Sequence, residues 1–284
     1  MAILIVLFIF SFVFVIGLCI GSFLNVCILR ALSGESIVFP SSKCPKCGNK
    51  LKWWHNIPVL SYVFLRGKCA FCKEHISIQY PIIELLTGII FTLEFLYFGT
   101  SLDTLFVWII SALLIVIAGT DIKEKVVFDV HTYSLIGVAV LYAFIKTAFT
   151  LWQSHHAGYA FSWDMFVFNP FVNSILGVLT GALIMEILAR LGYLVAGTRA
   201  FGEGDTLIAA GLGAVFGWLQ LLFVLILSVV IQTFIFENAC VICVFCNICR
   251  FVFPVPRKNW FWYFICNMYT GIGGFRWNCM YINI

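Results

Sequence analysis

Apolar runs of about 17 to 25 residues dominate this sequence, and that is the length an α-helix needs to cross a bilayer. The first run covers residues 1–29, and later runs begin near residues 81, 104, 131 and 171. The last apolar stretch, 206–236, is too long for one span, and its glycines predict a break into two packed helices. Composition agrees, because 62% hydrophobic and 11% charged residues lie far from the balance of a soluble globule. We therefore expect an all-α polytopic membrane protein with about seven to eight transmembrane helices.

Positive charge sets the expected topology. Residues 30–80 form a loop with two acidic residues and eight basic ones, namely Arg30, Lys43, Lys46, Lys50, Lys52, Arg66, Lys68 and Lys73. Loops rich in Lys and Arg stay on the cytoplasmic side, so this loop should be cytoplasmic and the N-terminus outside. The small net charge of +4 follows from this bias, and no nucleic-acid motif accompanies it. Lipid is an expected partner and nucleic acid is not.

Two CxxC pairs lie in the basic loop. Cys44 and Cys47 form one pair, and Cys69 and Cys72 form the other. Four thiolates at this spacing can close a tetrahedral zinc site, and such a closed site is structural rather than catalytic. Two disulfides or four unused thiols are the alternatives, and a reducing cytoplasm argues against disulfides.

Two acidic residues stand where the chain meets the membrane. Asp121 lies at the inner end of the third span and Asp205 at the start of the sixth, so both should reach the cytoplasmic interface. Two close carboxylates share a proton and can activate water as base and acid. Gly202 and Gly204 would let a backbone approach Asp205. The alternatives are a helix N-cap for Asp205 and a solvated helix end for Asp121.

These motifs together resemble a known family. The segments GSFLNVCILR (21–30), 39–88 with NIPVLSY and YPIIEL, TDIKEKVVFDV (120–130) and FGEGDTLIAAGLGAVFGW (201–218) are similar to bacterial prepilin peptidases, which are GxGD aspartic peptidases. The resemblance implies that Asp121 and Asp205 are the catalytic pair. It also implies cleavage of the basic leader of type IV prepilin or pseudopilin precursors after glycine at the cytoplasmic face. N-methylation of the new terminus with S-adenosylmethionine would follow, and the four cysteines match the family's zinc loop.

The sequence departs from the family pattern in three places. Phe128 and Asp129 follow Val127 where the family usually has Ile-Pro, and Leu207 replaces a common Lys. The tail, 237–284, does not resemble the family's last helix and holds six of the twelve cysteines. Its CxxCxxCxxC run resembles iron–sulfur spacing, whereas a divergent or frame-shifted tail is the simpler explanation.

The chain thus divides into a first span (1–29), a zinc-binding loop (30–80), a peptidase membrane core (81–236) and a divergent Cys-rich tail (237–284). The leading hypothesis is a membrane endopeptidase with N-methyltransferase activity. One rival is a non-enzymatic zinc-ribbon scaffold or transporter that uses the acids as ion ligands. The other is an inactive family member with a disrupted C-terminus.

Overall fold

The computed structural model describes residues 2–36, 43–44, 46–156, 169–196, 202–228 and 230. The chain divides into two compact units, 1–225 and 226–284, and the fold and site lie in the first. The expected Cys-rich tail, 237–284, lies outside the described residues.

Within the described residues, five helices are long and apolar enough to cross a membrane, which confirms the all-α membrane fold. They are α1 (Ala2–Ser33), α3 (Gln79–Phe98), α4 (Leu102–Glu124), α5 (Asp129–His156) and α7 (Pro170–Ala196). In the loop after α1 lie a short 3-10 helix, η1 (Trp53–Asn56), and the short helix α2 (Leu60–Phe64).

The last apolar stretch is broken as expected, at least as far as the described residues extend. Helix α8 (Glu203–Phe216) ends at Gly217, whose φ of 80° lies in the left-handed region that glycine adopts without strain. A second helix, Trp218–Ser228, follows directly. Helix α8, with 14 residues, is too short to span a bilayer alone, since a span needs about 20 residues.

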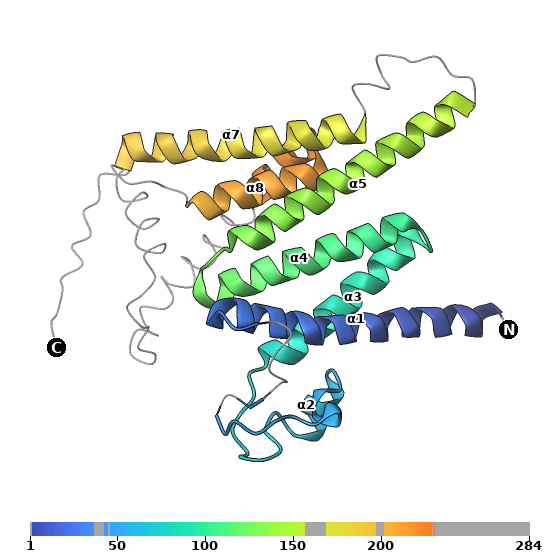
Figure 1. The fold of residues 1–284 in the computed structure, drawn as a ribbon, viewed down its shortest axis with the longest axis vertical. Coiled ribbons are helices and arrows are strands. Elements are labelled where there is room, and N and C mark those ends of the chain that lie inside the picture. The colour runs from blue at the N-terminus through green and yellow to red at the C-terminus, as the bar shows by residue number, and fades with distance from the viewer. Residues whose placement is uncertain are drawn as a thin grey trace. The chain divides into compact units, whose positions relative to one another are not determined.

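Successive helices run in opposite directions, so their ends gather in two groups (Figure 1). Helix α1 packs against α3 and α4, while α5 packs against α4, α7 and α8. The C-terminal ends of α1, α4 and α7 lie on the same side as the N-terminal ends of α3, α5 and α8 (Figure 1, left). This common side, here called the loop end, also receives the loop that joins α1 to α3.

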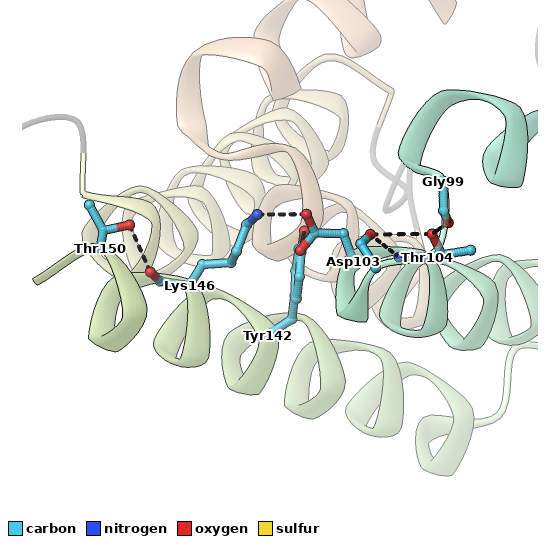
Figure 2. Close-up of polar contacts among 7 residues, drawn as sticks. Gly99, Asp103, Thr104, Tyr142, Lys146 and Thr150 are labelled. Atoms are coloured by element: carbon cyan, nitrogen blue, oxygen red, sulfur yellow. Dashed lines mark hydrogen bonds and ion pairs between the residues drawn. The ribbon is translucent and has the colours of Figure 1, made fainter. Parts of the chain in front are cut away.

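The opposite ends of α4 and α5 are joined by a charged cluster (Figure 2). Lys146 Nζ lies 2.8 Å from Asp103 Oδ2, and the Tyr142 hydroxyl donates to Asp103 Oδ1 at 3.1 Å. Ser101 precedes the cluster as the N-cap of α4 and accepts the amide hydrogen of Thr104. The cluster pairs the charges of Asp103 and Lys146 at a membrane edge, where an unpaired charge would be costly.

Glycines let the helices approach closely where they cross. A Cβ on Gly17 of α1 would lie 2.7 Å from the Cα of Gly88 on α3. The contact between α7 and α8 is closer still, since a Cβ on Gly177 or on Gly213 would lie 2.0 Å from the other residue's carbonyl oxygen. Lipid provides no hydrophobic force between helices, so such backbone contact supplies much of the packing energy.

We predict that Gly177→Ala destabilises the protein, because the added methyl group has no room against the Gly213 carbonyl. Overpacking of this kind costs about 1 to 3 kcal/mol or more. Gly137 is the matched control, because it is also helical yet a Cβ there meets nothing within 4 Å. Thermal unfolding in detergent should show a lower midpoint for Gly177→Ala and an unchanged or slightly higher one for Gly137→Ala. Equal midpoints would contradict the α7–α8 contact.

Candidate functional site

Each CxxC pair sits in a tight turn closed by its own backbone. The amide of Cys44 donates to the Asn49 carbonyl at 3.0 Å, and the amide of Gly48 donates to the Cys44 carbonyl at 2.9 Å. The second turn repeats the pattern, with the amide of Cys69 donating to the Glu74 carbonyl at 2.8 Å. Each turn therefore aims its two sulfur atoms to the same side, as a metal knuckle does.

The four sulfur atoms meet at one point. Their Sγ atoms all lie within 4.8 Å of one another, and those of Cys44 and Cys72 are 3.9 Å apart. A tetrahedral zinc ion with Zn–S bonds of about 2.3 Å would hold its sulfurs about 3.8 Å apart. Backbone N–H groups of Cys72 and Phe71 lower the pKa of the Cys69 thiol to about 7, which favours the thiolate. The four are free cysteines rather than disulfides, so the donor set fits zinc.

A buried carboxylate attaches this loop to the membrane helices. Glu84, in the second turn of α3, is only 7% exposed, and its Oε2 accepts the amide hydrogen of Val59 at 2.7 Å. Val59 has a φ of 60°, a conformation that costs energy for a β-branched residue. The sequence motif indicated that Glu84 matters but gave no sign of its partner.

A cavity of about 260 Å³ separates the loop from the helix ends. Two cysteines, Cys44 and Cys69, line it, together with Lys123 of α4, two residues beyond Asp121. The rest of the lining comes from α1, the first knuckle, the second knuckle with the residues that follow it, and α3, namely Asn25, Leu29, Lys46, Glu74, His75, Ile76, Ser77, Gln79 and Tyr80. Sequence analysis missed this cavity. A buried Asn25 within an apolar helix was the available signal, since polar residues in spans are costly.

Both predicted acidic residues lie at the loop end. Asp121 belongs to the last turn of α4, where its carbonyl accepts the amide hydrogen of Lys125. Asp205 is the third residue of α8, and its Oδ2 accepts the Gly202 amide hydrogen at 3.0 Å. The N-cap of α8 is Gly202, so the N-cap alternative for Asp205 is wrong in position, although Asp205 does cap the helix. Both carboxylates are exposed.

Apolar contacts join the segments that carry these acids. One cluster contains Ile117, a turn before Asp121, and Ile208, three residues after Asp205. A Cβ on Gly204 would lie 3.0 Å from the Cβ of Val127, in the connection between α4 and α5. Gly204 thus permits a close approach, whereas the nearest atom to a Cβ on Gly202 would be 3.6 Å away. No hydrogen bond joins the two carboxylates within the described residues.

Other charged residues singled out by sequence have simpler roles. Arg190 Nε lies 2.9 Å from Glu186 Oε1, four residues earlier on α7, as an ordinary helix-surface pair. Asp129 begins α5, where an acid is favoured by the helix dipole.

These observations define the class of protein to which the chain belongs. The chain is a multi-pass helical membrane protein whose first connecting loop carries a closed four-cysteine metal-type site. Its two singled-out aspartates stand at helix ends on the side of that loop.

Comparison with known proteins identifies the family. Residues 15–98 match the Bacterial Peptidase A24 N-terminal domain, and residues 108–236 match the Type IV leader peptidase family. The chain belongs to this family of peptidases.

Similar curated proteins support this family assignment. The chain is 34% identical to the prepilin leader peptidase/N-methyltransferase of Neisseria gonorrhoeae, over 72% of each chain. The Klebsiella pneumoniae protein of that name is 30% identical over 73% of this chain and 85% of its own length. The Myxococcus xanthus protein of the same name is 35% identical over 76% of this chain, which spans only 59% of that relative's length. No solved structure matches the chain.

We predict that Cys44→Ser removes bound metal and loosens the loop, because three sulfurs cannot close a four-coordinate structural site. Metal analysis of the purified protein should fall from about one zinc per chain to below about one tenth. Proteolysis between residues 46 and 78 should accelerate. Cys19→Ser, which changes an exposed thiol on α1, is the control and should keep both properties. Equal zinc content in the two variants would contradict the site.

Proposed function

We propose that this chain is a membrane aspartic endopeptidase that cleaves the basic leader of type IV prepilin or pseudopilin precursors after glycine. We propose further that it methylates the new N-terminus. The observation that best supports the cleavage site is the contact of Gly204 with Val127, together with the apolar cluster of Ile117 and Ile208. These contacts tie the helix end bearing Asp121 to the helix start bearing Asp205.

Asp121 and Asp205 would act as a proton-sharing pair. Once a substrate covers the site, two carboxylates in a drier environment cannot both ionise easily, so one holds a proton. The ionised member would take a proton from water as it attacks the scissile carbonyl, while the protonated member donates to the leaving amine. The hydrogen bond from the Gly202 amide to Asp205 Oδ2 fixes the orientation of this carboxylate at the start of α8.

The location of the pair suits the proposed substrate. A prepilin places an apolar stem in the bilayer and a charged leader in water, so its cleavage point lies at the interface. Asp121 and Asp205 are exposed and lie in the last turn of α4 and the first turn of α8, where we expect that boundary. The basic residues of the α1–α3 loop favour the cytoplasmic face for this end of an inner-membrane protein.

Methylation would use the cavity beside the zinc loop. We propose that Cys44, Cys47, Cys69 and Cys72 hold a structural zinc ion that forms one wall of this cavity. S-adenosylmethionine would supply an electrophilic methyl group there. Lys46 and Lys123 could bind its carboxylate, Glu74 its ammonium group, and the ring of Tyr80 its adenine. Lys123 lines the cavity two residues from Asp121, so the amine produced by cleavage would form close to the donor.

The first test is cleavage of a prepilin precursor by membranes containing the chain. We predict that Asp121→Asn and Asp205→Asn each lower the rate by roughly 100- to 10,000-fold, the usual contribution of an acid–base group. Asp129→Asn is the matched control, because this acid lies at the start of α5 on the same side yet has no proposed role. It should cleave at a rate close to that of the parent.

Other outcomes identify the rival hypotheses. A scaffold or transporter would show no cleavage by the parent chain, although the protein inserts normally and a related enzyme cuts the substrate. An inactive member with a disrupted tail would accumulate poorly whichever acid is changed. Undiminished cleavage by both asparagine variants would exclude the aspartic mechanism.

A second test separates the two activities. We predict that Leu29→Trp fills the cavity, so that methylation of the cleaved product is lost while cleavage continues. Mass spectrometry of the mature pilin reports both reactions in one sample. Phe23→Trp, on an exposed position of α1, is the control and should retain both. Full methylation by the Leu29 variant would show that the donor binds elsewhere.

A further inference from the structure

We propose that the loop between α1 and α3 carries a membrane-docking surface that binds the headgroups of anionic phospholipids. This docking surface consists of η1, α2 and the tip of the second knuckle. Its exposed apolar side chains are Trp53, Trp54, Leu60, Val63, Phe64 and Phe71. The inference does not depend on the proposed peptidase activity, because it concerns only how the loop meets the bilayer.

The aromatic part of the surface is exposed yet held in place. Trp53 is 76% exposed and Phe64 is 81% exposed, which water alone would disfavour. The rings of Trp53 and Trp54 meet edge to face, and His55 packs between Trp54 and Phe71 at centroid distances of 5.9 and 5.5 Å. Because Phe71 lies between two metal-ligating cysteines, the zinc knuckle fixes the orientation of the tryptophans. Exposed, ordered tryptophans are typical of the membrane interface.

The charged part of the surface selects the lipid. Lys52 Nζ lies 4.9 Å from the centre of the Trp54 ring, so a cation stands directly beside the aromatic patch. The same loop carries further exposed basic residues, namely Lys50, Arg66, Lys68 and Lys73. A basic cluster beside aromatic side chains complements a leaflet that contains negatively charged headgroups. Each Lys or Arg near such a leaflet strengthens binding by roughly fivefold.

The depth of the surface is fixed by the bond between Val59 and Glu84. Helix α3 begins at Gln79, so Glu84 lies about 8 Å along a helix that crosses the membrane. Val59 immediately precedes α2, and its bond therefore holds the start of α2 beside the second turn of α3. Figure 1 shows α2 to the side of α1 and α3 rather than beyond their ends. The exposed residues of α2 are thus level with the lipid interface.

Charge argues against the most obvious protein occupant. The leader of the proposed substrate is basic, and the docking surface is basic as well, so the two would repel each other. The leader would have to bind elsewhere on the loop end. An anionic leaflet is therefore the occupant whose chemistry fits both the aromatic and the basic side chains.

The test uses the full chain, zinc-loaded, in nanodiscs of phosphatidylcholine alone or with phosphatidylglycerol. Hydrogen exchange of residues 49–66 is measured by mass spectrometry. We expect exchange at least threefold slower in the anionic discs, and this difference should vanish in about 1 M salt, where charges are screened within about 3 Å. The double variant Lys50→Gln/Lys52→Gln should lose the difference between the lipids, whereas Trp53→Ser/Trp54→Ser should exchange faster in both. Trp152→Ser, an exposed tryptophan on α5, is the matched control and should behave as the parent.

Measurements on the parent chain alone can overturn the proposal, so the test remains decisive even if a variant fails to fold. Equal exchange in neutral and anionic discs would exclude a headgroup site. Protection that appears only when a prepilin is added would identify a protein-docking surface instead. Protection that depends on the number of chains per disc would identify contact between copies. Each of these results would replace lipid as the occupant.

Discussion

The bilayer's lack of hydrogen-bonding partners is the constraint on which this structure depends. Every backbone group within the hydrocarbon must be satisfied by its own helix, so a spanning chain can place irregular backbone, metal knuckles and exposed acids only at helix ends or beyond them. The four cysteines accordingly lie together in the α1–α3 loop, the cavity is lined by that loop and by α1, α3 and α4, and the two aspartates lie in the last turn of α4 and the first turn of α8. Within the spans, Asn25 and Glu84 are buried and paired, Asn25 with the Tyr80 carbonyl of α3 and Glu84 with the Val59 amide of the loop.

Much of this arrangement could be predicted from the sequence, for physical reasons that are local. The length of the apolar runs predicts the spans, and the CxxC spacing predicts the metal site. Gly217 predicts the break after α8, because few other residues adopt its positive φ. The positions of Asp121 and Asp205 at helix ends follow from where apolar runs stop. Each of these conclusions depends on residues that are neighbours in the chain.

What escaped prediction depends on contacts between distant residues. Nothing in the sequence says that Glu84 would bind the amide of Val59, 25 positions earlier, or that Asp103 would pair with Lys146 across two helices. The cavity was missed for the same reason, because its walls come from α1, the loop, α3 and α4. Capping was one of the alternatives predicted for Asp205, yet the N-cap position itself belongs to Gly202, three residues earlier.

The spacing of the two aspartates is set indirectly. Asp121 lies on α4, which packs with α1 and α3, while Asp205 lies on α8, which packs with α7. Helix α5 contacts both α4 and α8, so the gap between the carboxylates depends on two helix interfaces in series. Leu135 of α5 is fully buried at this point, and a Cβ on Gly211 of α8 would lie 2.9 Å from its Cδ2. A small rotation of either helix pair about α5 would therefore change the distance between the acids, while the bonds of Tyr142 and Lys146 to Asp103 hold the other ends of α4 and α5 together.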